Sequence, residues 1–148
     1  MKKWPSGRAY PRCLIGIVCS FAIPAWSADL SVSITGIEDL NAQVGCTLFS
    51  KPGGFPMDVS GTQEQWMPVD PGGTVCRFSG LADGSYAVSI GIDQNKNRKV
   101  DTNFLGIPTE QWGVSNNVRP SLRAPRFDEA AFKVQGGQDV AIQIKVAK

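Results

Sequence analysis

The chain has 148 residues, among them four cysteines and no histidine, and its formal net charge at pH 7 is +2. This length is enough for one domain with a hydrophobic core. Because histidine is the commonest general base and a common metal ligand, its absence disfavours histidine-dependent catalysis and histidine-containing zinc sites.

The N-terminal segment has the pattern of a secretory signal peptide. An apolar run over residues 14–23 follows several basic residues and ends at Pro24. The run is too short to span a bilayer comfortably, which favours a cleaved leader over a membrane anchor. The basic residues are Lys2, Lys3, Arg8 and Arg12.

Cleavage of this leader is expected close to Ser27. Residues 25–27 (Ala-Trp-Ser) give the small-x-small sequence that signal peptidase accepts, so the cut should follow Ser27 or Ala28. We therefore expect residues 1–28 to be a signal peptide. Residues 29–148 should then form an exported domain, either periplasmic or secreted.

Loss of residues 1–28 changes the charge of the chain. It removes four of the 15 Lys and Arg and none of the 13 Asp and Glu, so the net charge falls from +2 to −2. A basic nucleic-acid footprint is lost with the leader, and no later apolar stretch reaches transmembrane length. We therefore expect neither a nucleic-acid partner nor a transmembrane segment in the exported form.

Apolar and polar residues alternate through much of the remaining chain, which predicts half-buried β-strands. The predicted strands cover residues 30–35, 44–48, 76–78, 86–92, 131–134 and 140–146. Asp83-Gly84 marks a turn before a central strand, and Gly136-Gly137 predicts a closing hairpin between the last two strands. Since no segment of helical length shows helical spacing, we expect an all-β fold class, a single immunoglobulin-like β-sandwich of about seven strands.

Two long connections, residues 50–74 and 101–127, interrupt this pattern. Loops of that length inside a compact domain are usually functional or packed on themselves. The first contains Trp66 and the second contains Trp112. Exposed indole rings would favour a binding surface, whereas buried rings would favour loops that cover the ends of the sandwich.

Cys46 and Cys76 are the two cysteines outside the leader. Each lies at an inward position of a predicted strand, and an oxidising compartment makes a disulfide between them the simplest outcome. A redox pair or a pair of metal thiolates is disfavoured, because the spacing is not C-x-x-C and no histidine completes a zinc set.

The sharpest local pattern lies in residues 93–101. Side-chain oxygens stand at the first, third, fifth and ninth positions and a backbone carbonyl at the seventh, which is the spacing of calcium loops. We expect Glu110 to pack against this loop, within one folded unit of residues 93–117, and to be a candidate for a further carboxylate ligand. The expected calcium ligands are Asp93, Asn95, Asn97, the Lys99 carbonyl, Asp101 and Glu110.

The same loop departs from the EF-hand pattern. Arg98 stands where glycine makes the sharp turn, and Phe104 stands where the bidentate Glu should be. Lys96, Arg98 and Lys99 add positive charge that opposes a divalent cation. The alternative is an Asx-rich turn whose side-chain oxygens accept backbone amide hydrogen bonds, and both hypotheses stay open from the sequence.

Four segments carry a more specific pattern. They are residues 78–88 (FSGLADGSYAV), 93–101 (DQNKNRKVD), 105–117 (LGIPTEQWGVSNN) and 127–132 (FDEAAF). In that order they resemble the DUF2141 family of exported bacterial proteins, over residues 30–146. The resemblance implies an exported β-sandwich but no particular activity, substrate or cofactor. In family members the loop usually reads Asp-x-Asn-x-Asn-Gly, from which Arg98 departs.

The turn before Tyr86 is also similar to the corresponding turn of transthyretin-like and carboxypeptidase-regulatory-like sandwiches. Domains of those kinds serve as accessory or binding modules. The similarity therefore implies a transthyretin-like sandwich with an accessory or binding role.

The expected function is that of an exported accessory or binding domain with an unidentified ligand or envelope partner. One alternative is a structural envelope-associated protein without a ligand. A less favoured one is a hydrolase that uses the carboxylates of Asp93, Asp101 and Glu110. No serine has a G-x-S-x-G setting and no glycine-rich phosphate loop opens a helix, so we do not expect an enzyme. Calcium at residues 93–101 is the one cofactor that the sequence indicates.

Overall fold

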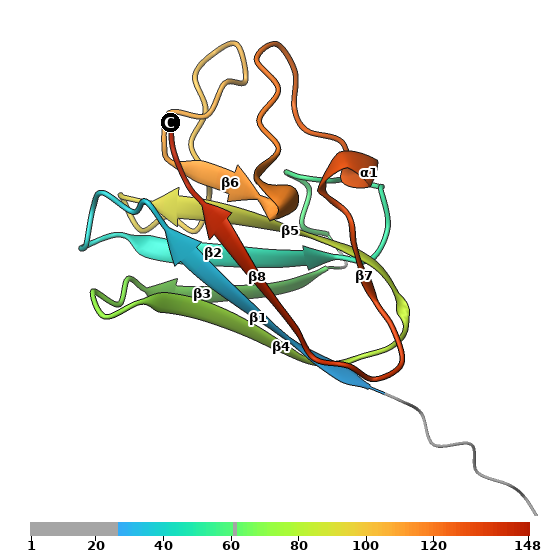
Figure 1. The fold of residues 1–148 in the computed structure, drawn as a ribbon. Coiled ribbons are helices and arrows are strands. Elements are labelled where there is room, and N and C mark those ends of the chain that lie inside the picture. The colour runs from blue at the N-terminus through green and yellow to red at the C-terminus, as the bar shows by residue number, and fades with distance from the viewer. Residues whose placement is uncertain (1–26, 61) are drawn as a thin grey trace, which may run out of the picture.

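The computed structural model describes residues 27–60 and 62–148, so the predicted signal peptide lies outside the described residues except for Ser27 and Ala28. The described chain is mostly β-strand and forms two sheets that pack together (Figure 1). The strands are β1 (Ala28–Thr35), β2 (Gln43–Phe49), β3 (Gln63–Pro68), β4 (Thr74–Leu81), β5 (Gly84–Asp93), β6 (Trp112–Val114), β7 (Phe132–Val134) and β8 (Val140–Lys145). A 3-10 turn, η1 (Ser115–Asn117), and one short helix, α1 (Phe127–Ala130), complete the elements.

The two sheets confirm the expected all-β sandwich. One sheet has the order β4-β1-β8, and the other has the order β3-β2-β5-β6 with β7 paired to the start of β5. Strands β3 and β6 lie inside the stretches predicted to be loops, 50–74 and 101–127, which explains why more than seven strands are present. Strand β3 was not predicted because its sequence, QEQWMP, has three polar residues followed by three apolar ones, so it lacks the alternation of apolar and polar residues.

The predicted closing hairpin is wrong. Strand β7 pairs antiparallel with β5, whereas β8 pairs parallel with β1 in the other sheet. The turn at Gly136 and Gly137, whose φ values are 64° and 66°, therefore carries the chain from one sheet to the other. Alternation shows which face of a strand is buried but does not show which strand it pairs with, and this is why the partner was misassigned.

The central position predicted for residues 86–92 is confirmed, because β5 pairs with β2, β6 and β7. The turn at Asp83 also joins the two sheets, since β4 pairs with β1 and not with β5. Within the described residues, no helix has the length and apolarity needed to cross a membrane.

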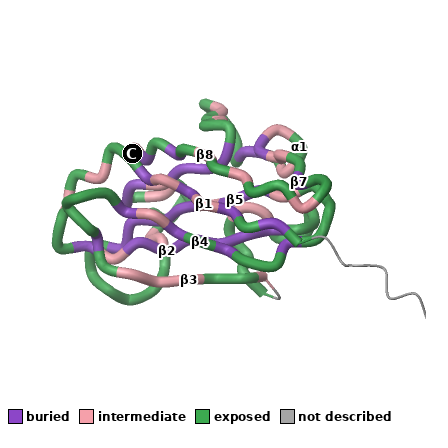
Figure 2. The backbone as a smooth tube through the Cα atoms, turned by 60° about the horizontal axis from the view of Figure 1, so that its bottom comes forward, coloured by how far each residue is buried: buried purple, intermediate pink, exposed green. Residues whose placement is uncertain are grey.

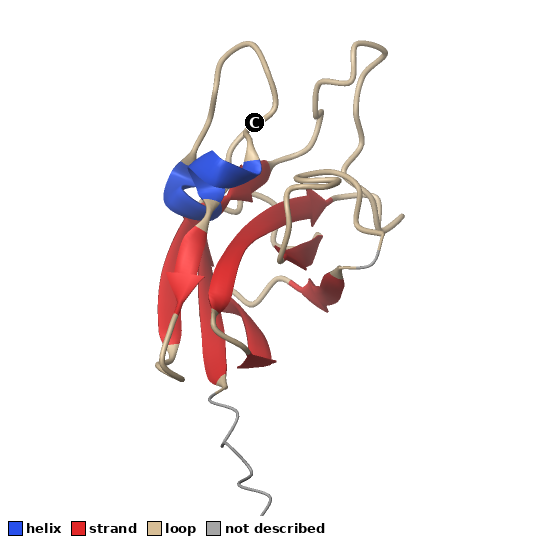
Figure 3. Cartoon of the chain, turned by 90° about the vertical axis from the view of Figure 1, so that its right-hand side faces the viewer, coloured by secondary structure: helices blue, strands red, loops and turns tan. Residues whose placement is uncertain are grey.

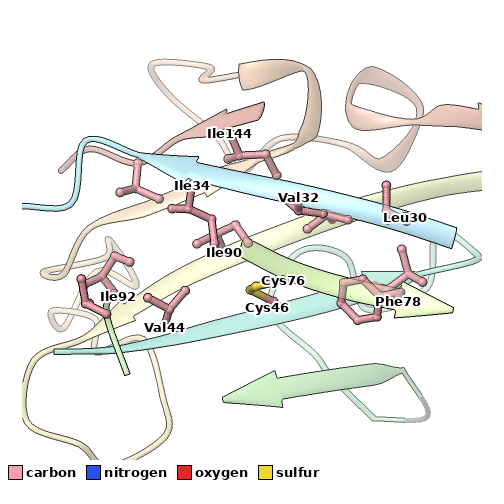
Figure 4. Close-up of a cluster of buried hydrophobic side chains, with 14 of the residues drawn as sticks. Leu30, Val32, Ile34, Val44, Cys46, Cys76, Phe78, Ile90, Ile92 and Ile144 are labelled. Atoms are coloured by element: carbon pink, nitrogen blue, oxygen red, sulfur yellow. A yellow bond between two sulfur atoms is a disulfide. The ribbon is translucent and has the colours of Figure 1, made fainter. Parts of the chain in front are cut away.

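The main core lies between the sheets, where inward side chains of both are buried (Figures 2 and 4). Cys46 on β2 and Cys76 on β4 are fully buried there and form the predicted disulfide, with their Cα atoms 6.5 Å apart. Because β2 and β4 belong to different sheets, the bond ties the two layers of the sandwich together. Other buried members of this core are Leu30, Val32, Ile34, Val44, Phe78, Val88, Ile90, Ile92 and Ile144.

A second, smaller core covers the outer face of β5 and β6. Ala87, Val114 and Ala130 are buried in it. The ring of Phe55 packs edge-on against the rings of Phe49 and Phe127, at centroid distances of 5.1 and 6.0 Å. This core fixes the position of α1 and of the chain that precedes it.

Candidate functional site

The loop after β5 is organised by its own side-chain oxygens. Asp93, the last residue of β5, is fully buried, and its carboxylate accepts hydrogen bonds from the backbone N–H groups of Asn97 and Arg98 at 3.2 and 2.6 Å. The side-chain oxygen of Asn95 accepts a bond from the N–H of Asn97 at 3.1 Å, and that of Asn97 accepts one from the N–H of Lys99 at 2.9 Å. These are the local bonds expected of an Asx-rich turn.

Glu110 closes this loop from the opposite side. It is 5% exposed, and its two carboxylate oxygens accept hydrogen bonds from the backbone N–H groups of Gln94 and Asp101, both at 2.8 Å. Gln94 and Asp101 stand at the two ends of the loop, so one side chain clamps both. The contact confirms the expected packing of Glu110 against the Asp93 loop.

The predicted calcium ligands share one hydrogen-bonded network. Asp101 accepts bonds from the side-chain amides of Asn95 and Asn97, at 2.7 and 3.1 Å. In the part of the chain that the structure describes, no three His, Cys, Asp or Glu side chains are grouped so that they could hold a metal ion. A calcium site here would have to use the Asn oxygens and the Lys99 carbonyl. Coordination by Asp93, Asn95, Asn97, Lys99, Asp101 and Glu110 stays a prediction.

Arg98 occupies a backbone conformation that suits glycine. Its φ is 59°, in the left-handed region where a Cβ atom is unfavourable. We expect Arg98→Gly to raise the free energy of unfolding by about 0.5–1 kcal/mol, as measured by urea denaturation, because the strain is larger than the entropy that glycine adds to the unfolded chain. The control is Arg77→Gly in β4, which should lower stability. Destabilisation by Arg98→Gly would show that the arginine side chain itself holds the loop.

Residues 102–108, here called the first finger, form a projection with internal hydrogen bonds after the Asp93 loop. Thr102 bridges Pro108, and the side-chain oxygen of Asn103 accepts hydrogen bonds from the N–H groups of Leu105 and Ile107 at 2.9 and 3.0 Å. These bonds turn three large apolar side chains outward. Their exposed fractions are 94% for Phe104, 67% for Leu105 and 56% for Ile107.

Residues 118–126, here called the second finger, project from the same side of the sandwich, beyond β6 (Figures 1 and 3). Leu122 is 99% exposed. Arg119 anchors the base: its guanidinium lies 4.3 Å from the centroid of the Trp112 ring and donates to the carbonyls of Trp112 and Ala147. Partial burial lowers the pKa of Arg119 from its ordinary value. The sequence does not predict either finger as an exposed apolar site, because the apolar residues of these loops carry no local signal that they stay exposed.

The second finger is also held by an ion pair. Arg123 donates two hydrogen bonds to the carboxylate of Glu129 in α1, and the backbone N–H of Arg126 donates a third at 2.9 Å. These bonds lower the pKa of Glu129 to about 2. The side-chain bonds from Arg123 are the main cause, and the backbone bond from Arg126 is the second.

This depressed pKa predicts a pH dependence. Because the folded-state pKa lies below the ordinary value of 4.5, the contribution of the pair is complete above about pH 4.5 and is lost as the pH falls toward 2. We expect Arg123→Ala to raise the pKa of Glu129 toward 4.5, as measured by NMR titration of its carboxyl carbon. Arg77→Ala on β4 is the control and should leave the titration unchanged. A Glu129 midpoint that stays near 2 without Arg123 would contradict this assignment.

The two tryptophans do not separate the binding and structural hypotheses, because both are half-buried. The ring of Trp66 lies so close over Gly45 that a Cβ atom there would be 2.6 Å from it, and the ring of Trp112 lies under Arg119. The strongly exposed apolar side chains of this region are instead those of the two fingers.

The structure adds no support to the carboxylate hydrolase. The carboxylates of Asp93 and Glu110 both hold backbone amides, as described above. A small pocket lies elsewhere and contains none of the predicted site residues. It is lined by Leu48, Phe49, Ser50, Lys51, Gly53, Thr62, Gln63 and Tyr86.

Comparison with known proteins agrees with the resemblance noted in the sequence. Residues 32–143 match the family model described as "Uncharacterized protein conserved in bacteria (DUF2141)". The chain belongs to the DUF2141 family. Searches of the curated proteins and of the solved structures found no match. In this DUF2141 protein the two disulfide-bonded cysteines, the Asp93 loop and the two fingers all lie inside the matched region, so the candidate site is part of the family domain and not an extension of it.

Proposed function

We propose that this DUF2141 protein is an exported binding domain without catalytic activity, which docks onto its partner through the two fingers. The observation that carries the proposal is the strong exposure of Phe104, Leu105, Ile107 and Leu122 at the ends of two loops on one side of the molecule. Exposed apolar patches of this kind are typical of interaction sites. Burial of one such side chain contributes about 1.5–3 kcal/mol, so four together could drive association.

The internal hydrogen bonds of the first finger support a binding role. Asn103 accepts two backbone hydrogen bonds and its own N–H donates to the carbonyl of Ile107 at 2.9 Å, so the tip is ordered before it meets a partner. A surface that is already ordered loses less conformational entropy on binding.

Export is supported by the leader pattern and by the disulfide, which forms in oxidising compartments. Ala28 is buried and begins β1 opposite Leu81. Cleavage after Ser27 would keep this residue in the sheet, so we favour Ala28 over Asp29 as the first residue of the exported form.

Envelope fractionation tests the proposal. The full chain is expressed with its leader in bacteria, and the share of processed protein that sediments with the envelope is measured. We expect Phe104→Ser combined with Leu122→Ser to release the protein, whereas Leu40→Ser should not. Leu40 is the matched control because it is 57% exposed in the loop between β1 and β2. Sedimentation that does not depend on the fingers would favour the structural envelope-associated alternative.

Calcium binding by the Asp93 loop is a second hypothesis. It is favoured by the burial of Asp93 and Glu110, neither of which forms an ion pair with any described residue. It is opposed by the positive charge of Lys96, Arg98 and Lys99.

A calcium titration of chelator-treated protein decides this hypothesis. Asp101→Asn is the informative variant because the carboxylate of Asp101 accepts hydrogen bonds only from side-chain amides, so the backbone of the loop keeps its bonds. If calcium binds, we expect saturable binding that Asp101→Asn weakens by about tenfold, since fewer charged ligands lower the affinity. Asp83→Asn, an exposed position, is the control. Absence of binding at millimolar calcium would leave the loop as a hydrogen-bonded turn.

A further inference from the structure

Charge is divided unevenly between the fingers and the rest of the exported chain. Residues 94–126 contain six Lys and Arg against two acidic residues, a net charge of +4. The remainder of residues 29–148 contains five Lys and Arg against 11 acidic residues, a net charge of −6. Of the six cationic residues, Arg123 and Arg126 pair with Asp128 and Glu129 just beyond the segment, so the positive charge without an ion-pair partner is concentrated at Lys96, Arg98 and Lys99.

The positive charge of this segment is accessible. Lys96, Arg98 and Lys99 are exposed at the base of the first finger, and none of them forms an ion pair with a described residue. Of the two acidic residues in the segment, Glu110 is buried and Asp101 is half-buried. The accessible charge of residues 94–110 is consequently mainly cationic.

The shape of this surface also restricts the kind of partner that can bind it. The two fingers are separate projections, as the two views in Figures 1 and 3 show, and their apolar side chains stand at the tips. A protein partner would need two pockets spaced to receive them. A lipid surface deforms around each tip and offers apolar chains below an anionic layer.

We propose that the fingers dock on an anionic phospholipid membrane. Phe104, Leu105, Ile107 and Leu122 enter the boundary between headgroups and acyl chains, and Lys96, Arg98 and Lys99 face the lipid phosphates. This inference rests on the proposed function, because it names the partner of the same surface. The anionic membrane repels the acidic remainder of the domain, and this repulsion orients the molecule so that its fingers point toward the membrane.

Vesicle co-sedimentation of the exported form tests the inference. We expect binding to vesicles of phosphatidylglycerol and phosphatidylcholine, weaker binding to phosphatidylcholine alone, and loss of the difference at high salt. Phe104→Ser should weaken binding to the mixed vesicles by about tenfold or more, which follows from the transfer free energy of one large apolar side chain. Neutralising Lys96, Arg98 and Lys99 with glutamine should weaken it by about fivefold per charge.

Two controls keep the result interpretable. Leu40→Ser removes an exposed apolar side chain that belongs to neither finger and should bind like the unmodified chain. Thermal unfolding of each variant checks that the domain stays folded, which is expected because all the substituted side chains are exposed.

The outcomes separate this inference from the proposed function. Failure of the unmodified protein to bind anionic vesicles, while envelope sedimentation in cells still depends on Phe104 and Leu122, would overturn the membrane proposal and indicate a protein partner. Envelope sedimentation that ignores the fingers, together with absent vesicle binding, would overturn both. Vesicle binding that Phe104→Ser and the lysine and arginine replacements each weaken would support both.

Discussion

Replacing Cys46 and Cys76 together with alanine is expected to lower the free energy of unfolding by about 3.5 kcal/mol. The bond closes a loop with a sequence separation of 30 residues, and the chain-entropy model gives this value for a loop of that length. The loss matters because the bond joins β2 to β4, and so joins the two sheets across the core.

Urea denaturation of the double variant against the unmodified protein, both as residues 28–148, measures this loss. The same unmodified protein under a reducing agent is the control, and it should be destabilised by a similar amount without any change of sequence. An effect well below 1 kcal/mol in both experiments would mean that the core holds the sheets together without the bond.

Glu110→Ala is expected to lower the free energy of unfolding by about 3 kcal/mol. The substitution leaves the N–H groups of Gln94 and Asp101 without their buried charged acceptor, and lost bonds of this kind cost about 1.5–3 kcal/mol each. It should also loosen the first finger, because the backbone carbonyl of Asp101 accepts a hydrogen bond from the N–H of Thr109 at 2.8 Å at the base of that finger.

Hydrogen exchange of the Gln94 and Asp101 amides, with urea denaturation alongside, measures both effects. Exchange at these amides should accelerate in Glu110→Ala, while amides of the central strand β5 stay protected. Glu64→Ala, on the exposed edge strand β3, is the control and should change stability by less than about 0.5 kcal/mol. Unchanged exchange at both amides would show that Glu110 does not clamp the loop.

The docking proposal gives this clamp a functional meaning. Glu110 and Asp93 order the loop that carries Lys96, Arg98 and Lys99, and the first finger begins directly after that loop. The cationic side chains and the apolar tip are therefore held on one ordered unit. Such ordering lowers the entropy that association must overcome.

The sequence by itself determined the properties that depend on local chemistry. Alternation of apolar residues identified the inward faces of β1, β2, β5 and β8, because successive side chains of a strand point to opposite faces. In β2 and β5 most of the outward positions are buried as well. Because Cys46 and Cys76 both lie at inward positions of predicted strands, the sequence predicted the disulfide between them. The spacing of Asp93, Asn95 and Asn97 gave an ordered turn, because these side chains bond to their own backbone.

Only the tertiary structure decided which strands pair and which loop residues stay exposed. The hairpin expected at Gly136-Gly137 did not form because β8 buries the same apolar face by pairing with β1, and a period of two cannot distinguish these partners. Phe104 and Leu122 are residue types that are usually buried, yet both lie in projecting loops. The hydrogen bonds of Asn103 hold the loop of Phe104, and the contacts of Arg119 and Arg123 hold the loop of Leu122. Whether an apolar side chain is exposed depends on which other parts of the folded chain pack against it, and a local sequence pattern does not contain that information.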